Sequence, residues 1–258
     1  MAISNGYNGL KGRVAIITGA GQGIGRRYAQ RFAEQGAIPV IAEFNAEAGR
    51  SVEAELKAAG HEALFVETDV ASEESANAMA QAVREAYGRI DILINNAAVF
   101  SKITMAPFWE LPPDEWERAM RVNISGPFYC ARAVRETMQA AHWGRIINVS
   151  SATVIMGRQN YLHYITSKSA VIGMTRSMAR ELGPWDITVN TFWPGVTQTE
   201  VERPSVPKEQ FEQLKQMQSL KRLTDMDDLA GAVMFLCSDD AAFITGQSLQ
   251  VDGGLTFI

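Results

Sequence analysis

A tyrosine and a lysine four residues apart carry the clearest chemical signal in the sequence. Tyr164 and Lys168 lie in a segment of helical periodicity, so their side chains share one face of the expected helix. A lysine ammonium near a phenol favours the phenolate and lowers the pKa of the tyrosine from its usual value of about 10. Such a tyrosine can exchange a proton with an alcohol or ketone oxygen near neutral pH. The pair therefore predicts acid–base chemistry on an alcohol or a carbonyl group.

Two serines lie ahead of this pair, at the end of an apolar run. Ser151 precedes Tyr164 by thirteen residues, and Ser150 stands beside it. A hydroxyl at the end of a strand can donate a hydrogen bond to a substrate oxygen and stabilise its developing charge. Either serine could do this, and the spacing to the tyrosine favours Ser151. Tyr161 lies nearby, but Ile165 stands where its lysine would be, so we expect it to line the substrate pocket.

A glycine-rich segment, TGAGQGIG at 18–25, joins an apolar run to a helical pattern. Glycines let the backbone approach a pyrophosphate closely, and the start of a helix offers free N–H donors at its positive dipole end. The alternative is a glycine turn that binds nothing, but the strand before it and the helix after it favour a dinucleotide. The expected contacts are Gly19, Gln22, Gly23, Ile24 and Gly25.

An acidic residue after the second apolar run bears on the choice of dinucleotide. Glu43 can accept hydrogen bonds from the ribose hydroxyls of the adenosine and would repel a 2′-phosphate. Gln22 is neutral and does not favour a 2′-phosphate either. We therefore expect NAD rather than NADP, although Glu43 could instead be a solvated surface residue. Asp69, after the third run, is placed either to meet the adenine or to act as a turn or helix-capping residue.

Short β-branched runs alternate with helical patterns along the whole chain. This alternation predicts one α/β domain, a doubly wound Rossmann-type parallel sheet of about seven strands with helices on both faces. Ligands bind at the carboxyl ends of the strands in such sheets. The expected strands lie at 14–17, 39–42, 63–66, 90–94, 145–149, 187–190 and 248–251, and the expected helices at 24–35, 46–59, 72–87, 114–141, 161–182, 208–218 and 226–237.

The composition argues against a nucleic-acid-binding, membrane-spanning, disulfide-rich or metal-binding protein. The 258 residues carry a net charge of −5, which gives no help to binding nucleic acid or an anionic membrane. Two lone cysteines and three scattered histidines form no disulfide framework or metal site, and no apolar run is long enough to cross a membrane. We expect a cytoplasmic protein without a signal peptide, with a flexible arm at 1–10 and a single catalytic domain at 11–258.

Eight motifs in order make the chain resemble a short-chain dehydrogenase/reductase over nearly its whole length. They are TGAGQGIG, TDV at 68–70, NNAA at 95–98, the asparagine of RVNISG, GRIINVSS at 144–151, YITSK at 164–168, PGVTQT at 194–199 and ITGQSLQVDGG at 244–254. The resemblance implies a catalytic tetrad of Asn123, Ser151, Tyr164 and Lys168. It implies that the asparagine interrupts its helix and holds a water, and that the lysine also binds the nicotinamide ribose.

The same resemblance implies further cofactor contacts, and the chain departs from the family pattern at one position. It implies that the segment after Pro194 holds the nicotinamide carboxamide, and that the chain assembles as a homotetramer through the long helices. The family usually has glycine where this chain has Ala98, whose methyl group narrows the nicotinamide region slightly. The further cofactor contacts expected are Val70, Asn96, Ala97, Tyr164, Lys168, Pro194, Gly195, Val196, Thr197 and Thr199.

The segments that face the substrate in this fold are apolar and aromatic here. We expect the pocket to include Val154, Tyr161 and Trp193, with the segment 200–222 covering it. Other apolar residues in these segments, equally explained as core or subunit contacts, are Phe100, Met105, Phe108, Trp109, Ile155 and Met156. This collection favours a hydrophobic ketone or secondary alcohol, as in the branch with aryl-alkyl alcohol dehydrogenases and pyridoxal 4-dehydrogenases. The alternatives are an NADPH-dependent 3-oxoacyl-thioester reductase and a non-catalytic nucleotide sensor.

Overall fold

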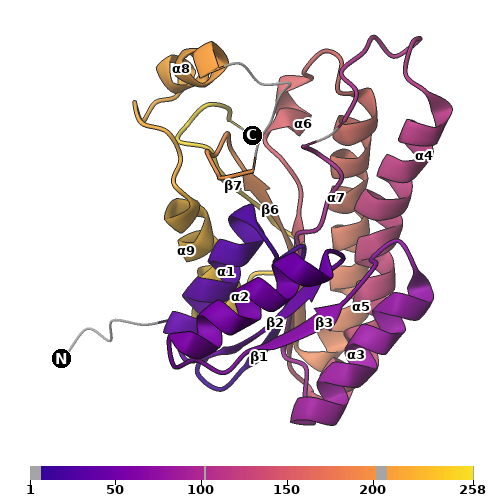
Figure 1. Ribbon diagram of the computed structural model, residues 1–258, viewed down its shortest axis with the longest axis vertical. Helices are drawn as coiled ribbons and strands as arrows, with labels where there is room; N and C mark the ends of the chain where they lie inside the picture. Colours follow the sequence, from indigo (N-terminus) through magenta and orange to yellow (C-terminus); the bar gives the residue numbers. More distant parts are fainter. Residues whose placement is uncertain (1–6, 102, 202–207, 258) are drawn as a thin grey trace.

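A parallel sheet of seven strands forms the centre of the computed structural model, which describes residues 7–101, 103–201 and 208–257 (Figure 1). Its strand order is β3-β2-β1-β4-β5-β6-β7, and every pairing is parallel. The expected doubly wound α/β domain is therefore confirmed. The strands are β1 (Val14–Thr18), β2 (Ile38–Glu43), β3 (Leu64–Glu67), β4 (Ile92–Asn95), β5 (Gly144–Val149), β6 (Ile187–Pro194) and β7 (Ser248–Val251).

Two hydrophobic layers, one on each face of the sheet, hold the helices. One layer joins the sheet to α1 (Gly23–Glu34), α2 (Ala46–Ala58) and α9 (Met226–Cys237). The other joins it to α3 (Glu73–Tyr87), α5 (Gly126–Ala141) and α7 (Leu162–Leu182). Because both faces are covered, β1, β4 and β5 are buried along their whole length, which explains their continuous apolar runs.

The strand order reverses direction beside β1. From β1 the chain moves outward through β2 and β3, and then crosses back to place β4 on the other side of β1. The crossover leaves a crevice at the carboxyl ends of β1 and β4, where ligands bind in open α/β sheets. The glycine-rich segment follows β1 and therefore opens directly on this crevice.

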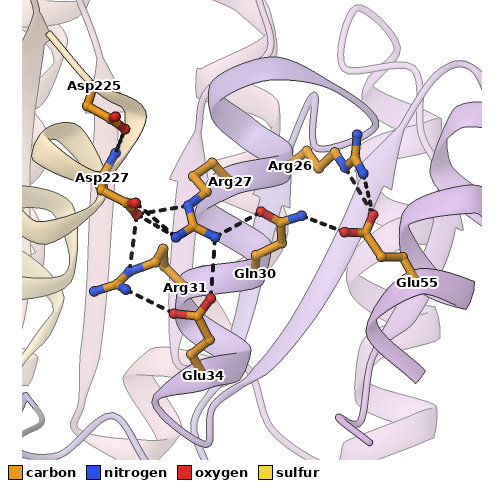
Figure 2. Close-up of polar contacts among 8 residues, drawn as sticks. All are labelled: Arg26, Arg27, Gln30, Arg31, Glu34, Glu55, Asp225 and Asp227. Atoms are coloured by element: carbon orange, nitrogen blue, oxygen red, sulfur yellow. Dashed lines mark hydrogen bonds and ion pairs between the residues drawn. The ribbon is translucent and has the colours of Figure 1, made fainter. Parts of the chain in front are cut away.

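Ion pairs on two sides of α1 fix the helix that this segment begins. Arg26 donates to a carboxylate oxygen of Glu55 on α2, with its shortest contact at 2.7 Å. Arg27 reaches Asp227 at the start of α9 in the same way (Figure 2). The start of α1 is thus held between two neighbouring helices as well as by its buried face.

The helix expected at 114–141 is built from three pieces. It consists of α4 (Pro113–Met120), a π-helical turn at Arg121–Ser125 and then α5. The extra residue in a π turn shifts the helix register, and such turns are frequent at functional sites. The interruption that the family resemblance implied at Asn123 is therefore confirmed.

The larger differences from the sequence prediction concern β6 and the segment after β5. β6 continues four residues beyond the expected end at 190 and reaches Pro194. A short helix, α6 (Thr153–Met156), lies between β5 and α7 where no element was expected. In the segment 200–222 the expected helix is present as α8 (Lys208–Met217), and residues 202–207 lie outside the described part of the chain.

The folded body begins a few residues before the predicted boundary at 11. Leu10 is completely buried in the layer around α1, and the backbone N–H of Tyr7 donates to the side-chain oxygen of Gln35. Residues 7–10 are therefore packed, because Leu10 fills a place in the core, whereas residues 1–6 of the predicted arm lie outside the described residues. None of the helices described is long and apolar enough to cross a membrane.

Candidate active site

The catalytic pair lies on the buried face of α7. Tyr164 and Lys168 are one helical turn apart, and the Lys168 Nζ lies 5.8 Å from the centroid of the Tyr164 ring. Both side chains line a cavity of about 770 Å³ at the carboxyl ends of the strands, and Ser151 lines the same cavity. The structure thus brings three members of the expected tetrad to one cavity.

The ammonium of Lys168 is buried and anchored to the sheet. Its Nζ donates to the backbone oxygen of Val149, the last residue of β5, at 2.8 Å. Burial disfavours the charged form and lowers the pKa of Lys168 from its ordinary value of 10.5 to about 8. The lysine is therefore held in place by the strand that carries the two serines.

A lowered lysine pKa makes stability depend on pH in a definite direction. Below about pH 8 the lysine is charged in both folded and unfolded chains, so its burial cost is fully present. As the pH rises from the folded pKa toward the unfolded one, the unfolded chain binds more protons and the folded chain gains stability. Relative to Lys168→Met, the wild type should gain roughly 2 to 3 kcal/mol between about pH 7 and about pH 10, measured by denaturant unfolding.

The loss of the hydrogen bond to Val149 in that variant is independent of pH and shifts only the baseline of the comparison. A difference in stability that stays flat over this range would contradict the buried ammonium. Measurements are made on the protein without added nucleotide, so that the ligand does not alter the pKa of Lys168.

The two serines have different roles in the structure. The Ser150 hydroxyl donates to the backbone oxygen of Lys168 at 2.7 Å and thus ties β5 to α7. The Ser151 oxygen accepts from the backbone N–H and the hydroxyl of Thr153, at 3.2 and 2.8 Å. The Ser151 hydroxyl proton can therefore point to a ligand in the cavity, which favours Ser151 as the reactive serine. The contact of Thr153, two residues further on, was missed by the sequence reasoning.

Asn123 acts on the site through the backbone around it. Its side-chain oxygen accepts from the Val99 N–H at 2.8 Å, and its amide donates to the Val99 oxygen at 3.3 Å and to the Ser167 hydroxyl at 3.0 Å. Ser167 in turn donates to the backbone oxygen of Tyr164 at 2.7 Å. Asn123 is not among the described residues that line the cavity, so its visible contacts position the loop after β4 against α7.

Aromatic rings surround the catalytic tyrosine. Phe100 packs on the Tyr164 ring with centroids 4.6 Å apart, and Tyr161 lies 6.4 Å from both rings. Phe100 lines the cavity, whereas Tyr161 is 1% exposed and lies behind it. Tyr161 therefore supports the wall of the pocket instead of forming its surface, which corrects the expected role.

Trp193 does not lie at the cavity. It is on β6, where its indole N–H donates to the Thr191 hydroxyl at 3.0 Å, and it faces a separate hollow beside Arg176 and Arg180 of α7. The prediction failed because the strand continues through this position, so the pleat directs the side chain to the α7 side. Val154, on α6, is also absent from the described residues that line the cavity.

The exposed aromatic residues after β4 likewise contribute no wall to the cavity. Phe108 and Trp109 are largely exposed and stack edge-to-face, with centroids 5.1 Å apart. Met105 packs beside the cluster of Tyr161 and Tyr164. Of the apolar residues considered for the pocket, Phe100 and Met156 line the cavity.

The glycine segment is shaped by contacts that exclude larger side chains. A Cβ on Gly19 would lie 2.8 Å from the Ala97 Cα, and a Cβ on Gly25 would lie 2.3 Å from the Gly19 oxygen. The Asn96 amide donates to the backbone oxygens of Thr18 and Gly19, at 3.0 and 3.2 Å. The loop is therefore packed closely on the β4 loop, with the N-terminus of α1 facing the cavity.

Glu43 lies at the end of β2 on the edge of the cavity. One carboxylate oxygen accepts from the Gly21 N–H and the other from the Asn45 N–H, both at 3.0 Å. The carboxylate thus joins the glycine segment to the start of α2 and is not a freely solvated surface charge. Asp69 lines the cavity and also accepts from the Ala71 N–H at 2.9 Å, so it is a turn residue facing the site.

The predicted cofactor residues all meet at one place. Every residue assigned to the cofactor from the sequence lines the same cavity as the catalytic pair. The helix start and the close-packed glycines match the needs of a dinucleotide. The residues that would hold the nicotinamide end are Pro194, Gly195, Val196, Thr197 and Thr199.

Charged residues at the cavity were missed by the sequence reasoning. Four of them come from α4 and the following turn, and their helical surroundings gave no sign that they face a ligand. They are Asp114, Glu117, Arg118 and Arg121. The search of the described residues also finds no group of three or more His, Cys, Asp or Glu side chains placed to bind a metal ion.

A doubly wound sheet with a dinucleotide crevice beside a Ser–Tyr–Lys group defines a class of oxidoreductase. A family model described as enoyl-(acyl carrier protein) reductase matches residues 19–256. The chain belongs to the short-chain dehydrogenase/reductase family.

Its relatives are similar over nearly their whole length. The chain is 37% identical over 246 residues to the hydroxy(phenyl)methyl-succinyl-CoA dehydrogenase subunit BbsD of Thauera aromatica, covering 95% of this chain and 97% of that protein. It is 36% identical over 254 residues to the short chain dehydrogenase/reductase astE of Aspergillus oryzae, covering 96% and 97%. It is 36% identical over 249 residues to the 3-oxoacyl-[acyl-carrier-protein] reductase FabG of Vibrio cholerae, covering 96% and 99%.

Proposed function

We propose that the protein transfers hydride between NAD(H) and a hydrophobic secondary alcohol or ketone. The observation that carries this proposal is the convergence of Ser151, Tyr164 and Lys168 with the glycine segment on one cavity. Nicotinamide, when bound, supplies the hydride acceptor or donor, and the protein orients and polarises the reacting groups.

The chain's own residues handle the proton and the oxygen. In the oxidation direction, the Tyr164 oxygen takes the hydroxyl proton of the alcohol while the Ser151 hydroxyl donates to the same substrate oxygen. The ammonium of Lys168, anchored on Val149, favours the phenolate form of the tyrosine. In the reduction direction the tyrosine returns the proton to the carbonyl oxygen.

The wall beside Tyr164 favours an apolar, ring-bearing substrate. Phe100 packs against the tyrosine and faces the cavity, and Met156 and Leu214 add apolar surface from α6 and α8. The phenyl group in the name of the Thauera aromatica relative agrees with this chemistry. The cavity also contains Arg158 and Arg118, so a 3-oxoacyl thioester is the competing candidate. The name of the FabG relative includes a 3-oxoacyl group and an acyl carrier protein.

A substrate panel tests the proposal directly. Aryl-alkyl alcohols, their ketones and a 3-oxoacyl thioester are assayed with NAD(H) and with NADP(H), at neutral and alkaline pH. Turnover of the simple alcohols and ketones with NAD(H) supports the proposal, whereas preference for the thioester with NADPH supports the reductase alternative. If the protein binds nucleotide but turns over none of these substrates with either cofactor, a nucleotide sensor is supported instead.

The choice of NAD rests on the negative charge of Glu43. In Glu43→Gln the amide oxygen still accepts from the Gly21 N–H, but the repulsion toward a 2′-phosphate is lost. We expect the ratio of kcat/KM with NADP⁺ to kcat/KM with NAD⁺ to rise about tenfold, as the loss of one like-charge contact implies. An unchanged ratio, or a wild type that already prefers NADP⁺, would refute the assignment of Glu43.

We also propose a homotetrameric assembly in a reducing compartment such as the cytoplasm. The outer faces of the long helices expose Phe128 on α5 and Leu162 on α7, each about two-fifths accessible, as expected of helices that meet a second copy. Cys130 and Cys237 are buried free thiols, which suits a reducing environment.

A further inference from the structure

A carboxylate lies at the start of α1, where the phosphates of a dinucleotide are expected. The Glu200 side chain accepts a hydrogen bond from the backbone N–H of Gly23, the first residue of α1, at 2.9 Å. Val201 packs on the same residue, since a Cβ built on Gly23 would lie 3.2 Å from its Cγ2. The segment just after Thr199 is therefore in direct contact with the glycine loop.

The start of a helix attracts one anion strongly and a second anion much less. Its free N–H groups and its positive dipole end act over only the first turn. Glu200 uses one of these donors, and it also lies 3.8 Å from the guanidinium of Arg26. Arg26 is already bonded to Glu55 at 2.7 Å, as Figure 2 shows. With Glu200, this one cation therefore faces two carboxylates. The positive charge at this end of α1 is thus shared before any phosphate arrives.

We propose that Glu200 is an internal competitor of the cofactor pyrophosphate and thereby sets the affinity for the dinucleotide. A pyrophosphate brings two negative charges to the N-terminus of α1, and like charges there repel. The carboxylate must therefore leave the Gly23 N–H, or remain at an electrostatic cost, when the dinucleotide binds. This inference rests on the proposed function only in that the ligand is a dinucleotide.

The test compares Glu200→Gln with the wild type by calorimetric titration of three probes. NADH and ADP carry a pyrophosphate and adenosine carries none. The variant keeps an oxygen that can accept from Gly23 but loses the charge, so the Kd for NADH and for ADP should fall about five- to tenfold. The Kd for adenosine should be unchanged. Glu136→Gln removes the same charge from an exposed site on α5 and should alter none of the three values.

Hydrogen exchange in the nucleotide-free protein gives a second readout. The Gly23 amide should exchange faster in Glu200→Ala than in the wild type, because its acceptor is removed, while the amides of β1 should not change. Equal exchange rates at Gly23 in the two proteins would show that the contact is absent and would overturn the inference.

The possible outcomes separate this inference from the proposed function. If Glu200→Gln binds NADH and ADP equally well or more weakly than the wild type, Glu200 is not a competitor and the inference fails alone. If neither protein binds NADH or ADP, the dinucleotide assignment fails and the inference falls with it. Tighter binding of adenosine as well would point to a general effect on the cavity and would also overturn it.

Discussion

Tyr164→Phe should lower kcat by about a thousandfold while leaving the Kd for NADH nearly unchanged. Removal of a positioned general acid or base costs about 10²–10⁴-fold, and a thousandfold loss corresponds to about 4 kcal/mol of transition-state stabilisation. The phenylalanine ring keeps the contact with Phe100, so the pocket wall is preserved. Steady-state kinetics and fluorescence titration with NADH measure the two quantities on the same preparation.

Tyr161→Phe is the matched control for this experiment. Its ring lies 6.4 Å from that of Tyr164, and its buried hydroxyl finds no hydrogen-bond partner within the described structure, so the substitution removes one oxygen without disturbing a contact. We expect kcat to change by less than about threefold. A large loss in Tyr161→Phe together with retained activity in Tyr164→Phe would reverse the roles assigned to the two tyrosines.

The two tyrosines also show what the sequence could and could not predict. Spacing alone identified the residue that shares a helical face with Lys168, because a helical period fixes which side chains are neighbours. It did not show that Tyr161 lies behind the pocket wall, because both tyrosines belong to one buried cluster in which Tyr164 lines the cavity and Tyr161 does not. The distinction depends on the path of the loop after β4, which local patterns do not determine.

The strands and the cofactor crevice could be predicted for a related reason. Continuous apolar runs mark strands that are buried on both faces. A glycine segment that joins a strand to a helix must lie at the carboxyl ends of the parallel strands. Trp193 was misplaced because no local pattern indicated that β6 continues through it. Glu200 was missed because its contact with Gly23 joins residues 177 positions apart in the sequence. Side-chain contacts between distant segments follow from packing and have no local signature.

Gly25→Ala should destabilise the protein and weaken the binding of NADH at the same time. The added methyl group would lie 2.3 Å from the Gly19 oxygen, 2.6 Å from the Asn96 amide nitrogen and 3.0 Å from the Ala20 Cα. Two of these neighbours are backbone atoms of the glycine loop itself, so the loop must move away from α1. Overpacking of this kind costs about 1–3 kcal/mol in stability. We expect a loss of about 2 kcal/mol and a rise in the Kd for NADH of at least about tenfold.

Gly183→Ala separates this steric effect from the general cost of replacing glycine. Gly183 has right-handed helical φ and ψ, and a Cβ built on it would meet nothing within 4 Å. Alanine there should leave the free energy of unfolding within about 0.5 kcal/mol of the wild-type value. The Kd for NADH should stay within about twofold of the wild-type value. Because Gly25 is also outside the left-handed region, any excess cost in Gly25→Ala comes from the close approach to Gly19. If Gly25→Ala binds NADH as tightly as the control does, the loop does not need this packing to hold the cofactor, and the assignment of the glycine segment as the pyrophosphate site is wrong.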